Sequence, residues 1–415
     1  MKFVIFIWRI MEWYIFIYPL AMSIIWTSAG FYFWWRRERN IDVWEKRWPE
    51  RWPPVTILVP CHNEEVNIAI TCTALQFLDY PDYRVVFIDD ASTDNTANII
   101  RRFLSLNPNF HLLCLEQNQG KAQALNCALS IGVTTPITVV IDADTILTPQ
   151  ALKHLVASFL SQPRLGAVTA NPITFNRRNI TEKLQAAEFS SIIGLIKRSQ
   201  RVLGRILTVS GCATAYRTEV LKEIGGFSSN TATEDIDVTW KIQRHFYEVW
   251  FVPQAIALIQ APSTLKEYWK QRKRWALGGW HLLRTHKDIF KDWRWRYLWP
   301  VYIDFVLAYV WSFSFVFGSF LWFISLPFSS PIGFSPIPAW CGALLSVAGV
   351  FQMFMAVILN HQYDPKLWRT VFWVPWYFIF FFAFGSLTVV WTAPKGLFGS
   401  LSGVGKWKSP IRVKI

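Results

Sequence analysis

Two long stretches without charged side chains constrain the fold of this chain more than any other feature of its sequence. The first, Trp13–Trp35, is long enough for one helix across a bilayer, which needs about 20 apolar residues. Basic residues follow it, so we interpret it as a membrane anchor and not as a signal peptide. The second, Phe305–Tyr363, is too long for one helix, and a segment rich in Pro, Ser and Gly divides it at 327–338. It predicts two more spans, at about 303–326 and 338–360.

A further apolar run covers about 369–392 and predicts a fourth span. If the residues between the first two spans lie in the cytosol, three later spans would place the C-terminus outside. The tail nevertheless carries cations, which prefer the cytosolic side. They are Lys395, Lys406, Lys408, Arg412 and Lys414. Either the last run is re-entrant or interfacial, or a short translocated tail breaks the charge rule, and the sequence leaves this open.

The net charge of +14 is explained by the membrane and not by nucleic acid. Basic residues cluster beside the apolar stretches, as expected on the cytosolic side and near anionic lipid headgroups. They are Arg36, Arg37, Arg39, Lys46, Arg47, Arg51, Arg294 and Arg296. No zinc-finger, RRM or homeodomain pattern is present. We therefore predict a multi-pass protein of the cytoplasmic (inner) membrane, with its middle part in the cytosol and no nucleic-acid partner.

Residues 53–260 contain strand and helix patterns in alternation. Short apolar runs predict strands at Val55–Val59, Arg84–Ile88, His111–Leu115, Ile137–Ile141 and Leu165–Thr169. Helices are predicted between them at Glu64–Phe77, Asp94–Leu104, Lys121–Ile131 and Pro149–Leu160. This alternation favours a Rossmann-like α/β domain with a parallel sheet and helices on both faces. Ligands of such sheets bind at the carboxyl ends of the strands, so the residues that follow the strands are the candidates for chemistry.

Polar residues follow the first two predicted strands. Pro60, Asn63 and Glu64 come at the end of the first and form a candidate ligand-facing rim, although Asn63 would equally serve as a helix N-cap. Asp90 comes where the second strand ends and can accept hydrogen bonds from a base or a ribose, while Ser92 or Asp94 would cap the next helix. No G-x-G-x-x-G or Walker-type loop is present, which argues against NAD enzymes and P-loop NTPases.

The sharpest motif is an apolar strand that ends in two carboxylates, Asp142 and Asp144. Mg²⁺ and Mn²⁺ take oxygen ligands and usually keep several waters and substrate phosphates, so these two residues would form a half-site that a diphosphate completes. The alternative is a turn with two solvated carboxylates. Lys121 opens a predicted helix after Gly120, where it either meets a phosphate or is simply solvated.

Two more motifs lie late in this domain and after it. Glu234 and Asp235 open a helix, where a carboxylate could act as general base toward an acceptor hydroxyl, and capping by Thr233 is the alternative. The segment Gln271–Trp275 lies just before the membrane. It is either a basic amphipathic helix or a site where Arg274 neutralises a departing diphosphate and the Trp stacks on an acceptor sugar.

The ordered set of a strand-end Asp, D-x-D, T-E-D and Q-x-x-R-W resembles the motifs of family 2 glycosyltransferases with a GT-A fold, in their processive membrane branch. That branch includes the cellulose, chitin, hyaluronan and poly-N-acetylglucosamine synthases. Within that branch the chain resembles bacterial poly-β-1,6-N-acetyl-D-glucosamine synthases at Gly166–Thr169, Glu188–Arg198, Thr208–Gly211 and Thr233–Asp237. The resemblance implies an α/β GT-A domain in the cytosol, joined to an α-helical transmembrane region.

The resemblance also implies roles at the matching positions. The nucleotide of a UDP-sugar would be bound by Pro60, Asn63, Glu64, Asp90, Lys121 and Asp142. The metal, Mg²⁺ or Mn²⁺, would be bound by Asp142 and Asp144. The catalytic residues would be Asp235, as general base, and Glu234. The diphosphate and the end of a growing polysaccharide acceptor would be held by Gln271, Arg274 and Trp275.

The implied domains are an N-terminal transmembrane helix with a basic linker (1–52), the GT-A domain (53–260), an amphipathic interface segment (261–298) and a C-terminal transmembrane region with a basic tail (299–415). The implied enzyme is a processive, inverting hexosyltransferase. It would polymerise N-acetylglucosamine from UDP-N-acetylglucosamine into a β-linked exopolysaccharide of biofilms, with an expected β-1,6 linkage, and would pass it across the lipid bilayer. A small membrane accessory subunit is an implied partner.

Several alternatives stay open at this level. Ala91 stands where the family usually has Gly, and Asp89 where many members have Asn. The product could be of the cellulose, chitin or hyaluronan type, or a single sugar on a lipid carrier. A different class of function is a catalytically silent membrane subunit that binds nucleotide or polysaccharide. Asp304 would line a channel for the polymer or lie at the membrane interface.

Overall fold

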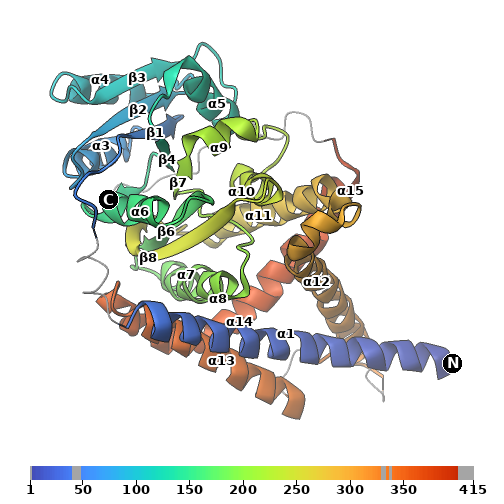
Figure 1. The fold of residues 1–415 in the computed structure, drawn as a ribbon. Coiled ribbons are helices and arrows are strands. Elements are labelled where there is room, and N and C mark those ends of the chain that lie inside the picture. Colours follow the sequence, from blue (N-terminus) through green and yellow to red (C-terminus); the bar gives the residue numbers. More distant parts are fainter. Residues whose placement is uncertain (1, 40–47, 329–332, 336–338, 401–415) are drawn as a thin grey trace. The chain divides into compact units, whose positions relative to one another are not determined.

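The computed structural model describes residues 2–39, 48–328, 333–335 and 339–400 (Figure 1). The predictions on Lys46, Arg47 and the tail cations beyond residue 400 lie outside this part of the chain. The chain divides into two compact units. The globular unit holds Arg37–Glu182 and Gly204–Glu267, and the helical unit holds Met1–Arg36, Lys183–Leu203 and Tyr268–Gly399.

The described residues of the globular unit form an eight-stranded sheet in the order β3-β2-β1-β4-β7-β6-β8-β5. Strands β1 to β4 pair in parallel, whereas β7 runs antiparallel to both of its neighbours, β4 and β6. Strand β8 pairs in parallel with β6 and antiparallel with β5. The bounds are β1 Val55–Cys61, β2 Tyr83–Asp89, β3 Phe110–Cys114, β4 Ile137–Ile141, β5 Ile146–Leu147, β6 Leu165–Thr174, β7 Ala213–Arg217 and β8 Glu248–Ile259.

All five predicted strands are present, but the prediction of a parallel sheet is wrong for its second half. Strand β1 is buried along its whole length, as expected of a parallel strand covered on both faces. Strand β7 has the sequence ATAYR, whose small and polar residues do not form an apolar run. Strand β8 alternates buried and half-buried residues and lies outside the strand–helix alternation on which the prediction rested.

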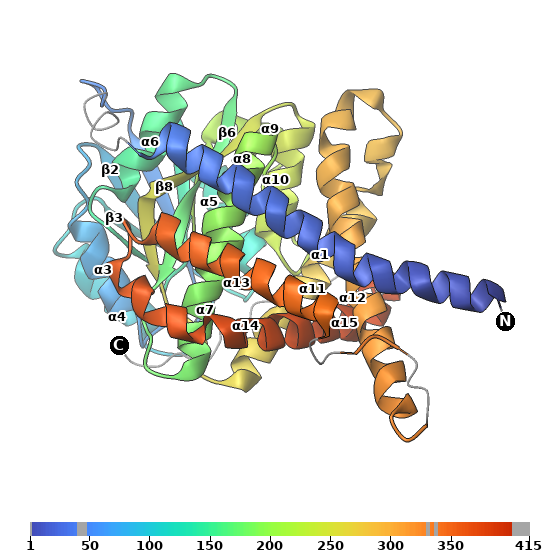
Figure 2. The ribbon, with the colours of Figure 1, turned by 90° about the horizontal axis from the view of Figure 1, so that it is seen from below.

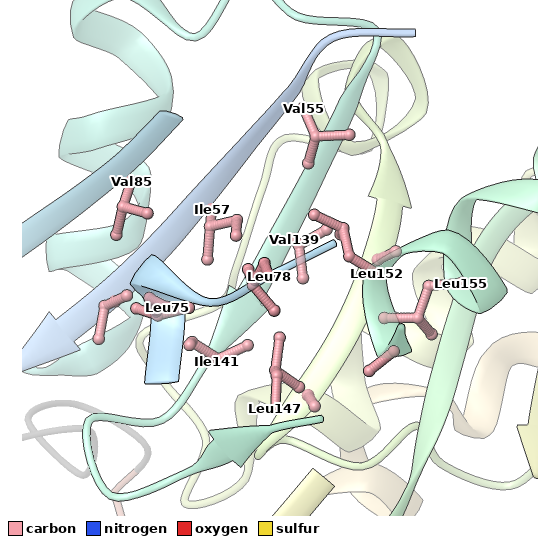
Figure 3. Close-up of a cluster of buried hydrophobic side chains, with 14 of the residues drawn as sticks. Val55, Ile57, Leu75, Leu78, Val85, Val139, Ile141, Leu147, Leu152 and Leu155 are labelled. Atoms are coloured by element: carbon pink, nitrogen blue, oxygen red, sulfur yellow. The ribbon is translucent and has the colours of Figure 1, made fainter. Parts of the chain in front are cut away.

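Helices cover both faces of this sheet, as predicted. Figure 3 shows alternate residues of β1, Val55 and Ile57, in one core with Leu75 of α3 and with Leu152 and Leu155 of α6. Helix α5 lies on the opposite side of β1 and β2 (Figure 1). The helices are α3 Ile68–Gln76, α4 Thr96–Leu104, α5 Lys121–Gly132, α6 Ala151–Ser161, α9 Thr218–Glu223 and α10 Glu234–Arg244.

The order of the strands reverses at β1. From β1 the chain adds β2 and β3 on one side, and it then adds β4 on the other. The loops after β1, β2 and β4 therefore meet at a topological switch point, where open α/β sheets bind their ligands.

The helical unit collects segments from three parts of the chain. Residues Lys183–Leu203, which lie inside the range predicted for the catalytic domain, belong to it. Figure 2 shows α1 and α13 running side by side. The bounds are α1 Lys2–Arg37, α7 Ile180–Phe189, η1 Ser190–Leu195, α8 Ile196–Leu203, α11 Leu265–Thr285, η2 Lys287–Phe290, η3 Trp293–Leu298, α12 Trp299–Ser325, α13 Trp340–Asn360, η4 Pro365–Trp373, α14 Val374–Phe380, η5 Phe381–Gly385 and α15 Ser386–Phe398.

Among the described residues, three helices are long and apolar enough to cross a membrane: Phe6–Arg37, Trp293–Ser325 and Trp340–Asn360. They contain nearly all of the three spans predicted at 13–35, 303–326 and 338–360. Large apolar side chains stay exposed on these helices, for example Phe317 at 54% and Val347 at 66%. Apolar surface of this extent is typical of a face that lipid covers.

The fourth predicted span, 369–392, is not a straight helix. The two helical segments Pro365–Tyr377 and Phe381–Phe398 are bent by 64° relative to each other. The π-helical turn η5 lies between α14 and α15, and such turns are often found where a helix changes direction or function. The described part of the chain has therefore three candidate spans, and a fourth only if this bent pair crosses the bilayer.

Candidate active site

Asp90 follows β2, and its side chain is completely buried. Its Oδ1 accepts the backbone N–H of Gln119, and its Oδ2 accepts that of Gly120, both at 2.8 Å. Gly120 has a φ of 88°, a conformation that favours glycine, and directly precedes α5. Asp90 therefore fixes the loop before Lys121, and the nucleotide contact predicted for it stays a prediction.

The residues after β1 are tied to the loop after β2. Asn63 has a φ of 55°. Its Oδ1 accepts the backbone N–H of Thr93 at 2.8 Å, and its own backbone N–H donates to Ser92 Oγ at 3.0 Å. Asn63 does not cap α3, because that helix begins at Ile68 with Asn67 in the N-cap position. Its side chain holds two strand-end loops together.

Ala91 and Asp94 lie in the loop after β2, and the structure shows what each of them does there. Ala91 has a φ of 54°, so the family's usual Gly at this position is favoured by the backbone conformation itself. Asp94 Oδ1 accepts the backbone N–H of Thr96, the first residue of α4, at 2.9 Å. The N-cap position itself is held by Asn95, so Asp94 satisfies the first N–H group of α4 from one residue before the cap.

His62 is a residue of this rim that the sequence analysis missed. Its Nδ1 lies 2.8 Å from the carbonyl oxygen of Asp90, and its Nε2 lies 3.0 Å from Nδ2 of Asn118. With Nδ1–H donating to the carbonyl, Nε2 accepts from the amide, so one imidazole joins the loops after β1, β2 and β3. Its place between two candidate residues was the only signal in the sequence.

Pro60 and Glu64 lie at the same end of the sheet but are buried. Pro60 is inside β1, and Glu64 is 1% exposed. The backbone N–H of Glu64 donates to Thr96 Oγ1 at 2.8 Å. Both residues shape the rim from beneath, and their contact with a nucleotide stays a prediction.

Lys121 is the centre of a charged cluster at the end of β4. Its Nζ lies 2.6 Å from Asp142 Oδ1, 2.8 Å from Glu234 Oε1 and 3.3 Å from the carbonyl oxygen of Gly211. Burial lowers the pKa of Lys121, but the two carboxylates outweigh burial and hold the pKa well above its usual value. Lys121 is therefore a fixed ammonium, and the alternative of a solvated lysine is wrong.

Asp235 reaches the same cluster beside Gly211. A Cβ at Gly211 would lie 2.9 Å from Asp235 Oδ2, so only glycine leaves room for this carboxylate. Gly211 comes just before β7, whose pairing with β4 places it next to the D-x-D motif. The backbone N–H of Asp142 donates to the carbonyl of Cys212 at 3.1 Å. In the sequence, residues 208–211 stand out only for their likeness to the family. The structure explains why Gly211 is needed there, because the antiparallel pairing of β7 with β4 brings it beside the D-x-D motif and Asp235.

Thr233 occupies the N-cap position of α10, but its side chain makes no capping bond. Its Oγ1 is buried and has no hydrogen-bond partner among the described residues. The capping alternative is therefore wrong. The acids in the first turn, Glu234 and Asp235 among them, are instead favoured by the positive end of the helix dipole.

The D-x-D motif offers hard oxygen donors. Thr71 Oγ1 donates to the carbonyl of Ala143 at 2.7 Å and so fixes the turn that carries Asp142 and Asp144. Among the described residues, no group of three or more His, Cys, Asp or Glu side chains could hold a metal on its own. The two carboxylates fit a half-site for Mg²⁺ or Mn²⁺, which phosphate oxygens and water would complete.

The Q-x-x-R-W residues lie on α11, in the helical unit. Gln271 Oε1 accepts from Gln185 Nε2 at 2.8 Å, and Trp275 stacks on Phe189 with the ring centroids 6.2 Å apart. Arg274 is exposed. Two of the three residues therefore contact the helix α7, and their predicted contacts with diphosphate and acceptor stay predictions.

The sequence analysis also missed an ion pair on this helix. Arg272 Nη2 donates to Glu188 Oε2 at 2.5 Å, and the two side chains are only 10% and 1% exposed. Tyr377 Oη donates to the other carboxylate oxygen of Glu188 at 3.2 Å. Burial raises the pKa of Glu188, and the Arg272 guanidinium only partly offsets this. The signal that could have found it was Glu188 following two Ala and preceding Phe189 on α7.

Asp304 lies in α12, where its Oδ1 accepts a hydrogen bond from Tyr18 Oη of α1 at 2.9 Å. This bond joins two of the candidate membrane helices. The channel-lining role considered for Asp304 stays a prediction.

Residues 53–278 match the family described as "Glycosyltransferase like family 2". The chain is 31% identical to a poly-β-1,6-N-acetyl-D-glucosamine synthase of Staphylococcus epidermidis, over 96% of this chain and 97% of the relative. It is 30% identical to a synthase of the same name from Staphylococcus aureus strain COL, over 95% and 97%. These likenesses confirm the family resemblance that the motifs predicted.

The fold is similar to the solved structure of the mannosyltransferase PcManGT from Pyrobaculum calidifontis in complex with GDP-Man and Mn²⁺. The TM-score is 0.59 at 21% sequence identity, and the match covers 92% of this chain and 99% of that one. It confirms the predicted combination of a GT-A-like domain with a helical region.

Proposed function

Because the chain belongs to glycosyltransferase family 2 and is a glycosyltransferase, we propose that it is a processive synthase of poly-β-1,6-N-acetyl-D-glucosamine. Its donor would be UDP-N-acetylglucosamine, and its acceptor the growing polysaccharide. The observation that carries this proposal is the likeness to enzymes of that name over nearly the full length of both chains. The acids and the lysine that converge at the end of β4 support the chemistry of transfer.

Transfer takes place by one displacement at the anomeric carbon. The O6 hydroxyl oxygen of the acceptor forms a bond to C1 while the bond between C1 and the diphosphate oxygen breaks, and UDP leaves. Asp235 accepts the hydroxyl proton, and attack from the face opposite the leaving group turns an α-linked donor into a β-linked product. A positioned general base of this kind contributes roughly 10²–10⁴-fold in rate.

Lys121 neutralises charge on the departing diphosphate. Its ammonium now contacts Asp142 and Glu234, and Asp142 is 31% exposed, so a phosphate oxygen can reach the ammonium from that side. Asp142 and Asp144 would hold Mg²⁺ or Mn²⁺, which supplies further positive charge to the diphosphate when bound. The loops around Asp90 and Asn63 would hold the base and the ribose.

Gln271, Arg274 and Trp275 would hold the diphosphate and the acceptor end. We place the globular unit in the cytosol, because Arg36 and Arg37 end the first candidate span on the side of that unit. The polymer would then leave through the helical unit, with a small membrane subunit as a further partner.

The test uses membrane vesicles that contain the full chain. Each UDP-sugar is supplied in turn with Mg²⁺ or Mn²⁺, and the product is sized and digested with linkage-specific glycosidases. We expect long chains from UDP-N-acetylglucosamine alone, open to an endo-β-1,6-hexosaminidase and resistant to chitinase. Vesicles carrying Asp235→Asn serve as the control for background enzymes.

Other outcomes point to the alternatives. A polymer cut by cellulase, chitinase or hyaluronidase would move the enzyme to another synthase of the same branch. A product in which a lipid carries a single sugar would show a non-processive transferase instead. Release of no UDP at all, with either metal, would favour a silent binding subunit.

A further inference from the structure

The buried ion pair in the helical unit holds the helix that carries the Q-x-x-R-W motif. Glu188 at the end of α7 accepts from Arg272 of α11 through Oε2 and from Tyr377 of α14 through Oε1. Three helices from distant parts of the chain thus meet on one carboxylate. The pair is closed to solvent, since the Glu188 side chain is 1% exposed.

Arg272 also fixes the aromatic side chains beside it on α11. Its guanidinium lies 4.4 Å from the ring centre of Trp275 and 4.6 Å from that of Tyr268. Residues three and four positions apart share one face of a helix, so these contacts form along a single stripe. Trp275 stacks in addition on Phe189, the neighbour of Glu188 in the chain. The orientation of Trp275 therefore depends on the ion pair.

A buried ion pair is weak grounds for stability, because apolar side chains of similar volume often serve as well or better. What the pair provides here is a defined geometry around Trp275. We propose that Glu188 is a positioning residue for chain elongation, and that it orients Trp275 of the acceptor-binding motif through Arg272. This proposal rests on the proposed function of the enzyme as a polysaccharide synthase.

The experiment compares Glu188→Gln and Tyr377→Phe with the matched control Glu223→Ala. Glu223 accepts a hydrogen bond from Tyr247 on the surface of the globular unit. We expect Glu188→Gln to lower the rate of elongation and the product length about 10–100-fold, the range found for residues that orient the ligands of a metal site through a hydrogen bond. Tyr377→Phe keeps the ion pair and should show a smaller loss of the same kind. The KM for UDP-N-acetylglucosamine and the acceptor-independent release of UDP should stay within about twofold of wild type.

The readouts separate this proposal from the function on which it rests. Wild-type vesicles that make no polymer would overturn the proposed function itself. Normal polymer from Glu188→Gln, or equal losses of UDP release and elongation, would overturn the positioning role. Tyr377→Phe decides the matter if Glu188→Gln does not accumulate in the membrane.

A separate observation concerns the bent segment Pro365–Phe398, whose two ends both lie beside helices that leave the globular unit. Before its start, Asn360 at the end of α13 donates from Nδ2 to the carbonyl of Ser190 at 3.0 Å. Ser190 directly follows α7. At its end, Arg284 in the last turn of α11 donates from Nη1 to the carbonyls of Gly396 and Gly399, each at 2.9 Å.

Helices α7 and α11 are on the same side of the membrane as the globular unit. In the described part of the chain, no candidate span lies between Arg37 and Trp293. The chain therefore does not cross the bilayer between the sheet and either helix. Both ends of the bent segment are on that side.

The middle of the segment reaches only part of the way across. Phe384 contacts the rings of Tyr268 and Trp269 on α11, with centroids 6.0 and 5.9 Å apart. Phe382 meets Trp311 at 5.2 Å. Trp311 lies roughly 18 Å along α12 from the start of that helix, in a bilayer core about 30 Å thick. Figure 1 shows α15 ending near α11 and the beginning of α12.

We infer that Pro365–Phe398 is a re-entrant segment, which enters the bilayer from the side of the globular unit, turns at η5 and returns to the same side. The chain then has three full spans. Gly399 then lies on the side of the globular unit, the side on which the positive charges of the tail sequence are expected.

The test places a protease-sensitive epitope tag after Ile415 of the full chain, and in a second chain after Gly333, between α12 and α13. Protease is added to intact spheroplasts and to permeabilised ones. We expect the tag after Ile415 to survive in intact spheroplasts and the tag after Gly333 to be cut. Loss of the Ile415 tag in intact spheroplasts would show that the segment crosses the membrane. Polymer synthesis plays no part in this readout.

Discussion

The Lys121–Asp142 pair of the globular unit and the Arg272–Glu188 pair of the helical unit have nearly the same separation, 2.6 and 2.5 Å. They differ in their surroundings. The side chain of Asp142 is 31% exposed, whereas that of Glu188 is 1% exposed. A ligand can therefore replace a carboxylate in the first pair but cannot reach the second.

This difference separates two uses of the same chemistry. The open pair keeps an ammonium in place with partners that a diphosphate can displace. The closed pair joins three helices, and removing one partner would leave a buried charge without compensation. We expect substitutions around the open pair to lower the rate with little loss of stability, and the removal of one partner of the closed pair to lower the stability as well as the rate of elongation.

The largest effect is expected from Asp235→Asn, beside the open pair. Loss of the general base should lower polymer synthesis roughly 10²–10⁴-fold. Binding of UDP, measured by calorimetry on the purified protein, should change little. The exposed Asp82→Asn serves as the control. Polymer synthesis at the wild-type rate would show that another group takes the proton.

Arg272→Met tests the closed pair by leaving Glu188 buried and unpaired. The free energy of unfolding should fall by about 3–5 kcal/mol. Denaturant unfolding in detergent, followed by tryptophan fluorescence, measures this change. The double substitution Arg272→Met with Glu188→Met should recover most of the loss, because it removes both charges. An unchanged midpoint for the single variant would place water or a counter-ion at this pair.

Lys121→Met removes the cation of the open pair. Transition-state stabilisation by a fixed charge of this kind contributes about 10²–10³ in kcat, and we expect a loss of that size. The unfolding midpoint should move much less than for Arg272→Met, since solvent reaches Asp142. A large loss of stability with little loss of rate would reverse the comparison between the two pairs.

Gly211→Ala sharpens the comparison, because it disturbs the open cluster without changing a charge. The new Cβ would lie 2.9 Å from Asp235 Oδ2 and must displace that carboxylate. A displacement of about 1 Å can lower the rate about 10²-fold. Steady-state kinetics should show the loss in kcat, with the KM for the donor nearly unchanged. Gly204→Ala is a poor control because of its positive φ, and Gly385→Ala, which has open space around its Cβ, is the better one.

The smallest effect is expected from Ala91→Gly. Ala91 has a φ of 54°, and relief of this strain should raise the free energy of unfolding by about 0.5–1 kcal/mol. The rate of polymer synthesis should not change. Thermal unfolding of the two proteins side by side measures the difference.

The first half of the sheet and the three candidate membrane-spanning helices could be predicted from the sequence, because each of them depends on a local apolar run. β1 and β4 are continuous buried runs, and α12 and α13 are long stretches without charge. Strand β7 could not be predicted, since its place between β4 and β6 is decided by pairing with distant residues.

The candidate site shows the same limit. Asp142 and Lys121 could be singled out because each stands at the end of a local pattern, but their contact could not be foreseen. The roles of Gly211 and Glu188 depend on partners 24 and 84 positions away in the chain, Asp235 and Arg272. No local pattern carries that information.

The π-helical turn η5 has a consequence for how this chain tolerates changes in length. A π-helical turn holds about one residue more than an α-helical turn. Deleting one residue from Phe381–Gly385 would therefore let this turn become α-helical and would reduce the 64° bend. The bent course of the chain brings Gly396 against Trp280, where even a Cβ would collide with the indole, and a straighter helix would lose this contact. Single-residue deletions in η5 should therefore be harmful.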